Sequence, residues 1–367
     1  MTKPEGERKE LDPWSTALVK DYDDLFQNFG LQRITLALRE KLSDSRNFRR
    51  GIVFAHRDFD KFVAAAERGE ATVVMSGIKP SSEFHLGSKL TAEEIVYLQK
   101  KFDSQVHYCV ADFEAYADNG LNYEQSAALA VDNVADLLAL GLDERKAVIY
   151  KQSRSLPVLN LALRASRKTT PATLEALYGH KNLALYLAVL VQAGDILHPQ
   201  LAEFGSCKHV CVPVGIDQDP HIRFARDLAA KMSFTAPAAT FHRLFRSLGG
   251  ETKMSKRDPL GVITLNDSPE QVKRKLANAF TGGRATVAEQ RRLGAEYEKC
   301  VVAELDWFHF EENDAAVFER KRKCLSGELL CGECKKQVAE KITSFLRAHQ
   351  EKKRKFKPKA EKILGDC

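Results

Sequence analysis

The length, composition and charge of the chain set the first limits on what the protein is. It has 367 residues, of which 44% are hydrophobic and 29% are charged, and its formal net charge is +6 at pH 7. These values are typical of a soluble protein with two or three domains. No apolar run approaches the roughly 18 residues of a membrane span, and residues 1–5 carry no apolar signal core. We therefore expect no membrane association and a cytoplasmic location.

The predicted elements alternate between apolar strands and amphipathic helices. Residues 71–76 are expected to form a strand, and a turn-rich stretch leads from it into a helix that ends near residue 102. Further strands of the same parallel sheet are expected at 105–111, 147–151 and 209–215. Residues 125–140 carry apolar side chains at three- and four-residue spacing and stop at Gly141, as a helix facing the core does. This alternation predicts an α/β fold with a doubly wound, Rossmann-like sheet, whose ligand lies beyond the carboxyl ends of the strands.

The segment Phe84-His85-Leu86-Gly87-Ser88 opens the helix that follows the first of these strands. A strand, a turn with Gly77 and Lys79, and a helix N-terminus form an anion site, because free backbone N–H groups and the positive end of the helix dipole face the loop. His85 can donate to a phosphate oxygen, and Gly87 lets an adenine ring approach without a Cβ in the way. Taken alone, such a string is more often a turn that enters a helix.

A second segment, Lys253-Met254-Ser255-Lys256-Arg257, follows the glycine pair at 249–250. The ammonium groups of Lys253 and Lys256 can close over a pyrophosphate leaving group and neutralise charge in the transition state. Either segment is a weak signal by itself. Both in this order, after a strand and after a glycine pair, indicate a site that joins an amino acid to the α-phosphate of ATP.

With these two segments the chain resembles the class I aminoacyl-tRNA synthetases, whose signatures are known as HIGH and KMSKS. Ser88 stands where the family has His or Asn, and Arg257 stands where it has Ser. Because Ser88 can still donate to a phosphate, the resemblance implies catalysis by His85, Ser88, Lys253 and Lys256, with Mg²⁺ bridging the phosphates of ATP. The residues that it implies for ATP binding are Gly77, Lys79, His85, Gly87, Gly215, Asp217, Gln218, Met254 and Ser255.

Polar residues follow the last predicted strand, where a ribose is expected. Asp217 can accept from ribose hydroxyls, Gly215 allows close approach, and Gln218 can bridge sugar and amino acid. A helix cap and turn explain Asp219 and Pro220, but they do not explain Gly215 and Asp217. The string resembles the Gly-x-Asp-Gln segment of the tryptophanyl and tyrosyl subgroup.

Similarity to the tryptophanyl synthetases is spread over most of the chain. Residues 12–14 and 49–58 resemble the N-terminal extension of archaeal and eukaryotic members, and residues 279–284 and 326–333 resemble their C-terminal region. The resemblance implies ATP-dependent ligation of tryptophan to its tRNA through tryptophanyl-adenylate.

The predicted amino-acid pocket departs from the family pattern. Gln192 matches the family glutamine beside the substrate, and Asp195 matches an acidic position of bacterial tryptophanyl and archaeal tyrosyl enzymes. With Gln218, they can hold an ammonium, a hydroxyl or an indole N–H. Met75 stands where a tyrosine is common, and for Asp112 the alternative to a substrate contact is a strand-end cap. Because one changed donor can redirect specificity, a tyrosyl-tRNA synthetase and a non-catalytic tRNA-binding paralogue remain alternatives.

Four of the eight cysteines are grouped near the C-terminus, at Cys300, Cys324, Cys331 and Cys334. Without a secretory signal we expect no disulfide framework, and ligation by cysteine alone suits zinc or a [4Fe–4S] cluster. The spacing Cys-x6-Cys-x2-Cys resembles the iron–sulfur variant of some tryptophanyl synthetases. Zinc sites usually show two close pairs, which favours the cluster. The alternative is that Cys300, which begins an apolar stretch, is an inert core thiol.

The resemblance, together with a helix-rich and charged composition from about residue 267 onward, implies three regions. These are an N-terminal extension at 1–70, a catalytic domain at 71–265 with an insertion at about 113–205, and a helical domain at 266–367. The helical domain is expected to read the anticodon, and its basic tail at 352–359 either touches RNA or is solvated. The resemblance implies tRNA(Trp) and tryptophan as partners, no DNA, and a homodimer formed through the insertion.

Overall fold

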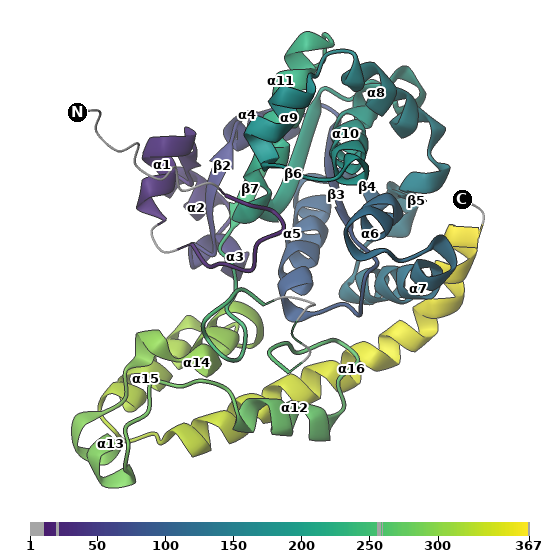
Figure 1. Ribbon diagram of the computed structural model, residues 1–367. Coiled ribbons are helices and arrows are strands. Elements are labelled where there is room, and N and C mark those ends of the chain that lie inside the picture. The colour runs from purple at the N-terminus through teal and green to yellow at the C-terminus, as the bar shows by residue number, and fades with distance from the viewer. Residues whose placement is uncertain (1–10, 20–21, 255–257, 259, 366–367) are drawn as a thin grey trace, which may run out of the picture.

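The fold is built on one sheet of seven strands in the described part of the chain (Figure 1). The computed structural model describes residues 11–19, 22–254, 258 and 260–365. The strand order is β1-β2-β7-β6-β3-β4-β5. The strands are β1 (Gln32–Arg33), β2 (Val53–Arg57), β3 (Thr72–Ile78), β4 (Gln105–Val110), β5 (Ala147–Lys151), β6 (His209–Gly215) and β7 (Ala238–His242).

The five strands from β7 to β5 run parallel, which confirms the predicted α/β class. The sequence did not indicate β7, nor the antiparallel edge formed by β1 and β2. Both edge strands come from the stretch predicted as an N-terminal extension, so part of that stretch completes the catalytic sheet. Strands β4 and β6 are buried along almost their whole length, as expected where helices cover both faces.

Helices cover both faces of the sheet because side chains alternate along each strand. On β3, Val74 packs with α4 and α5, whereas Val73 and Met75 pack in the core formed with α8, α10 and α11. The helices of this part are α1 (Asp23–Phe29), α2 (Leu36–Lys41), α3 (Arg46–Arg49), α4 (Phe59–Glu67), α5 (Leu86–Phe102), α6 (Asp112–Asn119), α7 (Tyr123–Leu140), α8 (Leu156–Ser166), α9 (Pro171–Tyr178), α10 (Leu183–Leu197) and α11 (Asp219–Lys231).

Helix α7 matches the helix predicted from apolar spacing at 125–140, with two further residues at its start. The Asn122 side chain and Gln125 form a capping box there, and Gly141 ends the helix with a φ of 110°. Helix α11 starts one residue earlier than predicted. Asp219 is its first helical residue, and the Asp219 carboxylate pairs with Arg57 at 2.8 Å instead of capping the helix.

A helical domain follows the sheet and extends away from it (Figure 1). It consists of α12 (Pro269–Ala277), α13 (Val287–Leu293), α14 (Val301–Leu305), α15 (Asp314–Leu325) and α16 (Cys331–Gly365). Helix α16 crosses back and packs on α7, so the basic stretch at 352–359 is helical. Lys353 is buried there, with its ammonium 2.7 Å from Asp132 and 2.8 Å from Asp136 of α7. In the described residues, no helix is long and apolar enough to cross a membrane.

Glu94 of α5 is a buried carboxyl group that should make stability depend on pH. Thr240 Oγ1 donates to its Oε1 at 2.5 Å, and burial raises the pKa of Glu94 to about 8. The native state therefore holds a proton that the unfolded chain releases above about pH 4.5. The contribution of this group is fully present below that pH and is lost as the pH rises to about 8.

We predict that Glu94→Gln flattens the fall of unfolding free energy over this pH range, since the amide keeps the Thr240 contact without titrating. In the unchanged protein the slope from this group reaches roughly 1.4 kcal/mol per pH unit. Urea unfolding at about pH 5, 6.5 and 8 measures both proteins. Equal slopes in the two proteins would contradict the prediction.

Candidate active site

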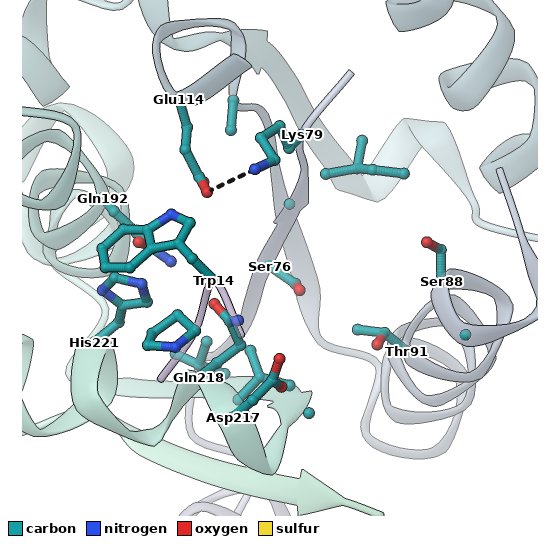
Figure 2. Close-up of a pocket in the computed structure, with 18 of the residues that line it drawn as sticks. Trp14, Ser76, Lys79, Ser88, Thr91, Glu114, Gln192, Asp217, Gln218 and His221 are labelled. Atoms are coloured by element: carbon teal, nitrogen blue, oxygen red, sulfur yellow. Dashed lines mark ion pairs between the residues drawn. The ribbon is translucent and has the colours of Figure 1, made fainter. Parts of the chain in front are cut away.

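A cavity of about 370 Å³ lies at the carboxyl ends of the parallel strands (Figure 2). This is the edge of the sheet where the sequence predicted a ligand. The described part of the chain includes all but two of the predicted catalytic, ATP-binding and amino-acid-binding residues. Those that line the cavity are Met75, Gly77, Lys79, His85, Gly87, Ser88, Gln192, Asp195, Gly215, Asp217, Gln218, Lys253 and Met254.

Three predicted residues are not among those that line the cavity. Ser255 and Lys256 lie outside the described residues. Asp112 is described, but its carboxylate accepts from the backbone N–H and the hydroxyl of Ser153, and from the Phe113 N–H at 3.1 Å. Asp112 therefore forms the strand-end cap that was its alternative interpretation, and it anchors the turn after β5.

His85 stands at the N-terminus of α5, where it was expected to meet a phosphate. Its Nδ1 accepts from the Ser88 N–H at 3.3 Å, so the ring proton resides on Nε2, which faces Ser88 Oγ at 3.5 Å. A Cβ on Gly87 would lie 2.9 Å from the imidazole. A side chain at this position would therefore displace the His85 ring.

The turn between β3 and α5 is held by close packing and by ion pairs. A Cβ on Gly77 would lie 2.6 Å from the carbonyl oxygen of Cys109, so glycine permits β3 and β4 to approach. The Lys79 ammonium lies 2.5 Å from Asp118 and 3.3 Å from Glu114 (Figure 2). Burial lowers the pKa of Lys79, but these two carboxylates raise it by more. Lys79 therefore carries its charge at the cavity wall.

Asp217 and Lys253, predicted to bind ribose and pyrophosphate, form an ion pair with each other. The Lys253 backbone N–H also donates to the Thr16 carbonyl at 2.9 Å. The lysine segment is thereby tied both to the strand end of β6 and to the N-terminal segment. The carboxylate and the ammonium, opposite in charge, thus lie together in the lining of the cavity.

Asp195 of α10 is fully buried in the lining of the cavity. The Tyr150 hydroxyl donates to its Oδ1 at 2.8 Å, and Gln152 Nε2 donates to its Oδ2 at 2.5 Å. Burial raises the pKa of Asp195 to about 7, even though these two hydrogen bonds lower it. Asp195 is thus a carboxyl group whose oxygens are already engaged by the protein.

Trp14 is a cavity residue that the sequence did not mark as a site residue. Its indole ring lies beside Gln192 and His221 in Figure 2, across the cavity from Ser88. Its ring centroid is 5.6 Å from that of His221, and the Lys181 ammonium is 5.2 Å from the indole. The N-terminal segment therefore supplies one wall of the cavity.

Gln152 and His242 line the cavity and were also missed. Each is the residue at or just after the end of a parallel strand, β5 and β7. The strand-end rule that singled out Asp217 would have found Gln152, because β5 was predicted. It could not have found His242, because β7 was not.

The four grouped cysteines line one small cavity of about 10 Å³ in the helical domain, together with Thr281 and Arg320. The Gln290 side chain donates to Cys331 Sγ at 3.3 Å. Among the residues that the structure describes, no three His, Cys, Asp or Glu side chains are placed to hold a single metal ion. The thiols therefore converge, but not as closely as ligands of one ion do.

Comparison with known proteins shows the family of the chain. The model of the class I tRNA synthetases for tryptophan and tyrosine matches residues 67–347. The chain belongs to this family. Among its relatives, the tryptophan–tRNA ligase of Aeropyrum pernix is 43% identical over 96% of this chain and 97% of its own length. The tryptophan–tRNA ligase of Methanocaldococcus jannaschii is 40% identical over 97% of this chain and 98% of its own length.

Solved structures of the family share the whole fold. The tryptophanyl-tRNA synthetase of Aeropyrum pernix superposes with a TM-score of 0.89, at 43% identity over 96% of this chain and 98% of that one. The tryptophanyl-tRNA synthetase of Giardia lamblia gives a TM-score of 0.84 at 27% identity, over 94% of this chain and 95% of that one. As in the family, the protein is a class I synthetase with a mostly parallel sheet.

We predict that Lys253→Met lowers kcat of amino-acid-dependent pyrophosphate exchange about 100-fold, because a cation is lost beside the leaving group. The KM for tryptophan should change less than about threefold. The matched control is Lys275→Met, which removes a buried lysine paired with Asp267 at 2.7 Å and outside the cavity. A loss of kcat in the control as large as in Lys253→Met would contradict the role of Lys253.

Proposed function

We propose that the protein ligates tryptophan to tRNA(Trp), by way of tryptophanyl-adenylate. The observation that carries this proposal is the single cavity at the strand ends, lined by His85, by Lys253 and by the Gly215–Gln218 turn. Its relatives at 40% identity and above are tryptophan–tRNA ligases. Tryptophan and ATP give the adenylate and pyrophosphate, and the acyl group then passes to the terminal adenosine of the tRNA.

The first step needs no side-chain nucleophile. The carboxylate of tryptophan attacks the α-phosphate in line, so the protein contributes position and charge stabilisation. His85 Nε2–H donates to a phosphate oxygen, while Lys253 and Lys256 neutralise the pyrophosphate as it leaves. Enzymes of this family use ATP with Mg²⁺. The ion supplies further charge neutralisation and is held chiefly by phosphate oxygens, so it needs few protein ligands.

The residues proposed for the amino acid are Gln192, Asp195, Gln218 and Met75, all of which line the cavity. A tyrosyl enzyme and a non-catalytic paralogue were the alternatives from sequence. Neither is favoured by the relatives, and Lys253, a residue that a non-catalytic paralogue would not need, lines the cavity beside Asp217.

Pyrophosphate exchange measured with each of the twenty amino acids tests the proposal. We expect exchange with tryptophan at least about 100-fold above tyrosine in kcat/KM, because a buried polar site rejects a wrong hydrogen-bond pattern strongly. Preference for tyrosine would make the protein a tyrosyl enzyme. Binding of tRNA without exchange for any amino acid would make it a paralogue.

We further propose a homodimer formed through α8 and α10, within the predicted insertion. Large apolar side chains are exposed there in the described part of the chain: Leu156 is 66% exposed, Leu163 69% and Leu183 82%. The helical domain is proposed to bind the anticodon, and the location is proposed to be cytoplasmic, where tRNA is charged. Light scattering that gives the 41.1 kDa mass of one chain would contradict the dimer.

We propose that the four grouped cysteines hold a [4Fe–4S] cluster. One observation supports this: the four thiols line one cavity. A four-iron cluster keeps its ligand sulfurs farther apart than one zinc ion does, because each thiolate binds a different iron. Cys300, Cys324, Cys331 and Cys334 would be the ligands.

We predict that the anaerobically purified protein contains iron and acid-labile sulfide and absorbs at about 400 nm. Cys331→Ser should lower the iron content, the sulfide content and this absorbance. Cys207→Ser is the control, because Cys207 is buried elsewhere, donating to the Ala71 carbonyl at 3.1 Å. One zinc per chain without sulfide would assign zinc. Protein with neither metal would leave the thiols as core residues.

A further inference from the structure

The buried polar group at the amino-acid end of the cavity contains one acceptor without a partner. Asp195 already accepts from Tyr150 on Oδ1 and from Gln152 on Oδ2. Gln152 lines the cavity and is 2% exposed, and it opens the turn Gln152–Arg154 that follows β5. Its Oε1 is buried and has no hydrogen-bond partner in the described residues. A buried amide oxygen left in this way costs free energy until a ligand donates to it.

The orientation of this amide is fixed by its neighbour. The NH₂ group of Gln152 donates to Asp195 Oδ2, so the amide oxygen of Gln152 points to the other side. Met75, Cys109 and Ile196, which also line the cavity, offer an apolar surface and at most a weak sulfur acceptor. Among the described residues that line the cavity, Gln152 Oε1 is the buried acceptor that lacks a hydrogen-bond partner.

Tryptophan presents one hydrogen-bond donor on its side chain, the indole N–H, and no acceptor. We propose that Gln152 Oε1 accepts this N–H and is a specificity-determining contact, with Asp195 as a positioning residue that holds the amide. This inference rests on the proposed function, since it concerns the amino acid that the enzyme activates. Asp195, matched to an acidic family position, then acts through Gln152 instead of meeting the indole itself.

A site of this kind distinguishes tryptophan from an analogue of the same shape without the donor. With such an analogue, Gln152 Oε1 stays unpaired in the complex, and the loss appears in kcat/KM. The probe is 3-(benzothiophen-3-yl)-L-alanine, in which sulfur replaces the indole N–H.

The experiment measures pyrophosphate exchange with tryptophan and with the benzothiophene analogue in the full-length protein. We expect the unchanged protein to prefer tryptophan by at least about 100-fold in kcat/KM. In Gln152→Met, which keeps the length of the side chain but removes the oxygen, this ratio should fall to within about tenfold. A purely structural role would lower kcat/KM for both substrates equally and leave the ratio unchanged, which would overturn the proposal.

Gln99→Met is the matched control. Gln99 is also 2% exposed, but both ends of its amide are satisfied by the backbone of Asp143, at 3.0 and 2.9 Å, outside the cavity. Its substitution should leave the ratio unchanged, and an equal fall in the ratio would overturn the proposal.

Asp195→Asn keeps the test decisive if Gln152→Met does not fold. An amide at this position no longer fixes the orientation of Gln152, so the ratio should fall, and an unchanged ratio would overturn the proposal. If the preference for tryptophan over the analogue is lost in Asp195→Asn but kept in folded Gln152→Met, the proposal is also overturned, and the acceptor is assigned to Asp195. If the unchanged protein shows no exchange with tryptophan, the proposed function fails instead, so the two failures are distinguishable.

Discussion

Parallel pairing of the strands is the constraint on which the site depends. Only when β3 to β7 run in one direction do their carboxyl ends meet at one edge of the sheet. There, residues from distant parts of the chain surround one cavity, and the N-terminus of α5 opens into it. The backbone hydrogen bonds of the sheet thus bring the site residues together, and a side chain joins the site when it lies at the end of its own strand.

The elements that could be predicted are those with a strong local signal. The strands β3 to β6 are continuous apolar runs, and α7 combines apolar spacing with a glycine stop. The edge of the sheet could not be predicted, since β2 and β7 are five residues each and pair antiparallel across a long stretch of chain. Such pairing depends on tertiary contacts and leaves little trace in the sequence.

The same limit applies to the site. Positions next to strand ends, such as Gly215 and Asp217, were found because the rule for parallel sheets is local. The ion pair of Asp217 with Lys253 and the place of Trp14 in the cavity wall depend on how distant segments meet. A motif assigns chemistry to a residue, but it does not say which other residue will occupy its charge or its hydrogen-bonding capacity.

Helix α16 also limits how the chain can change in evolution. One end carries two of the grouped cysteines, and the other is fixed to α7 through Lys353 and His349. In an α-helix each inserted residue rotates the remainder of the helix by about 100° and advances it by about 1.5 Å. A single insertion between these ends would break one attachment or the other. Seven inserted residues restore nearly the same face but still lengthen the helix by about 10.5 Å. Changes in length should therefore be confined to the loops on either side of the helix.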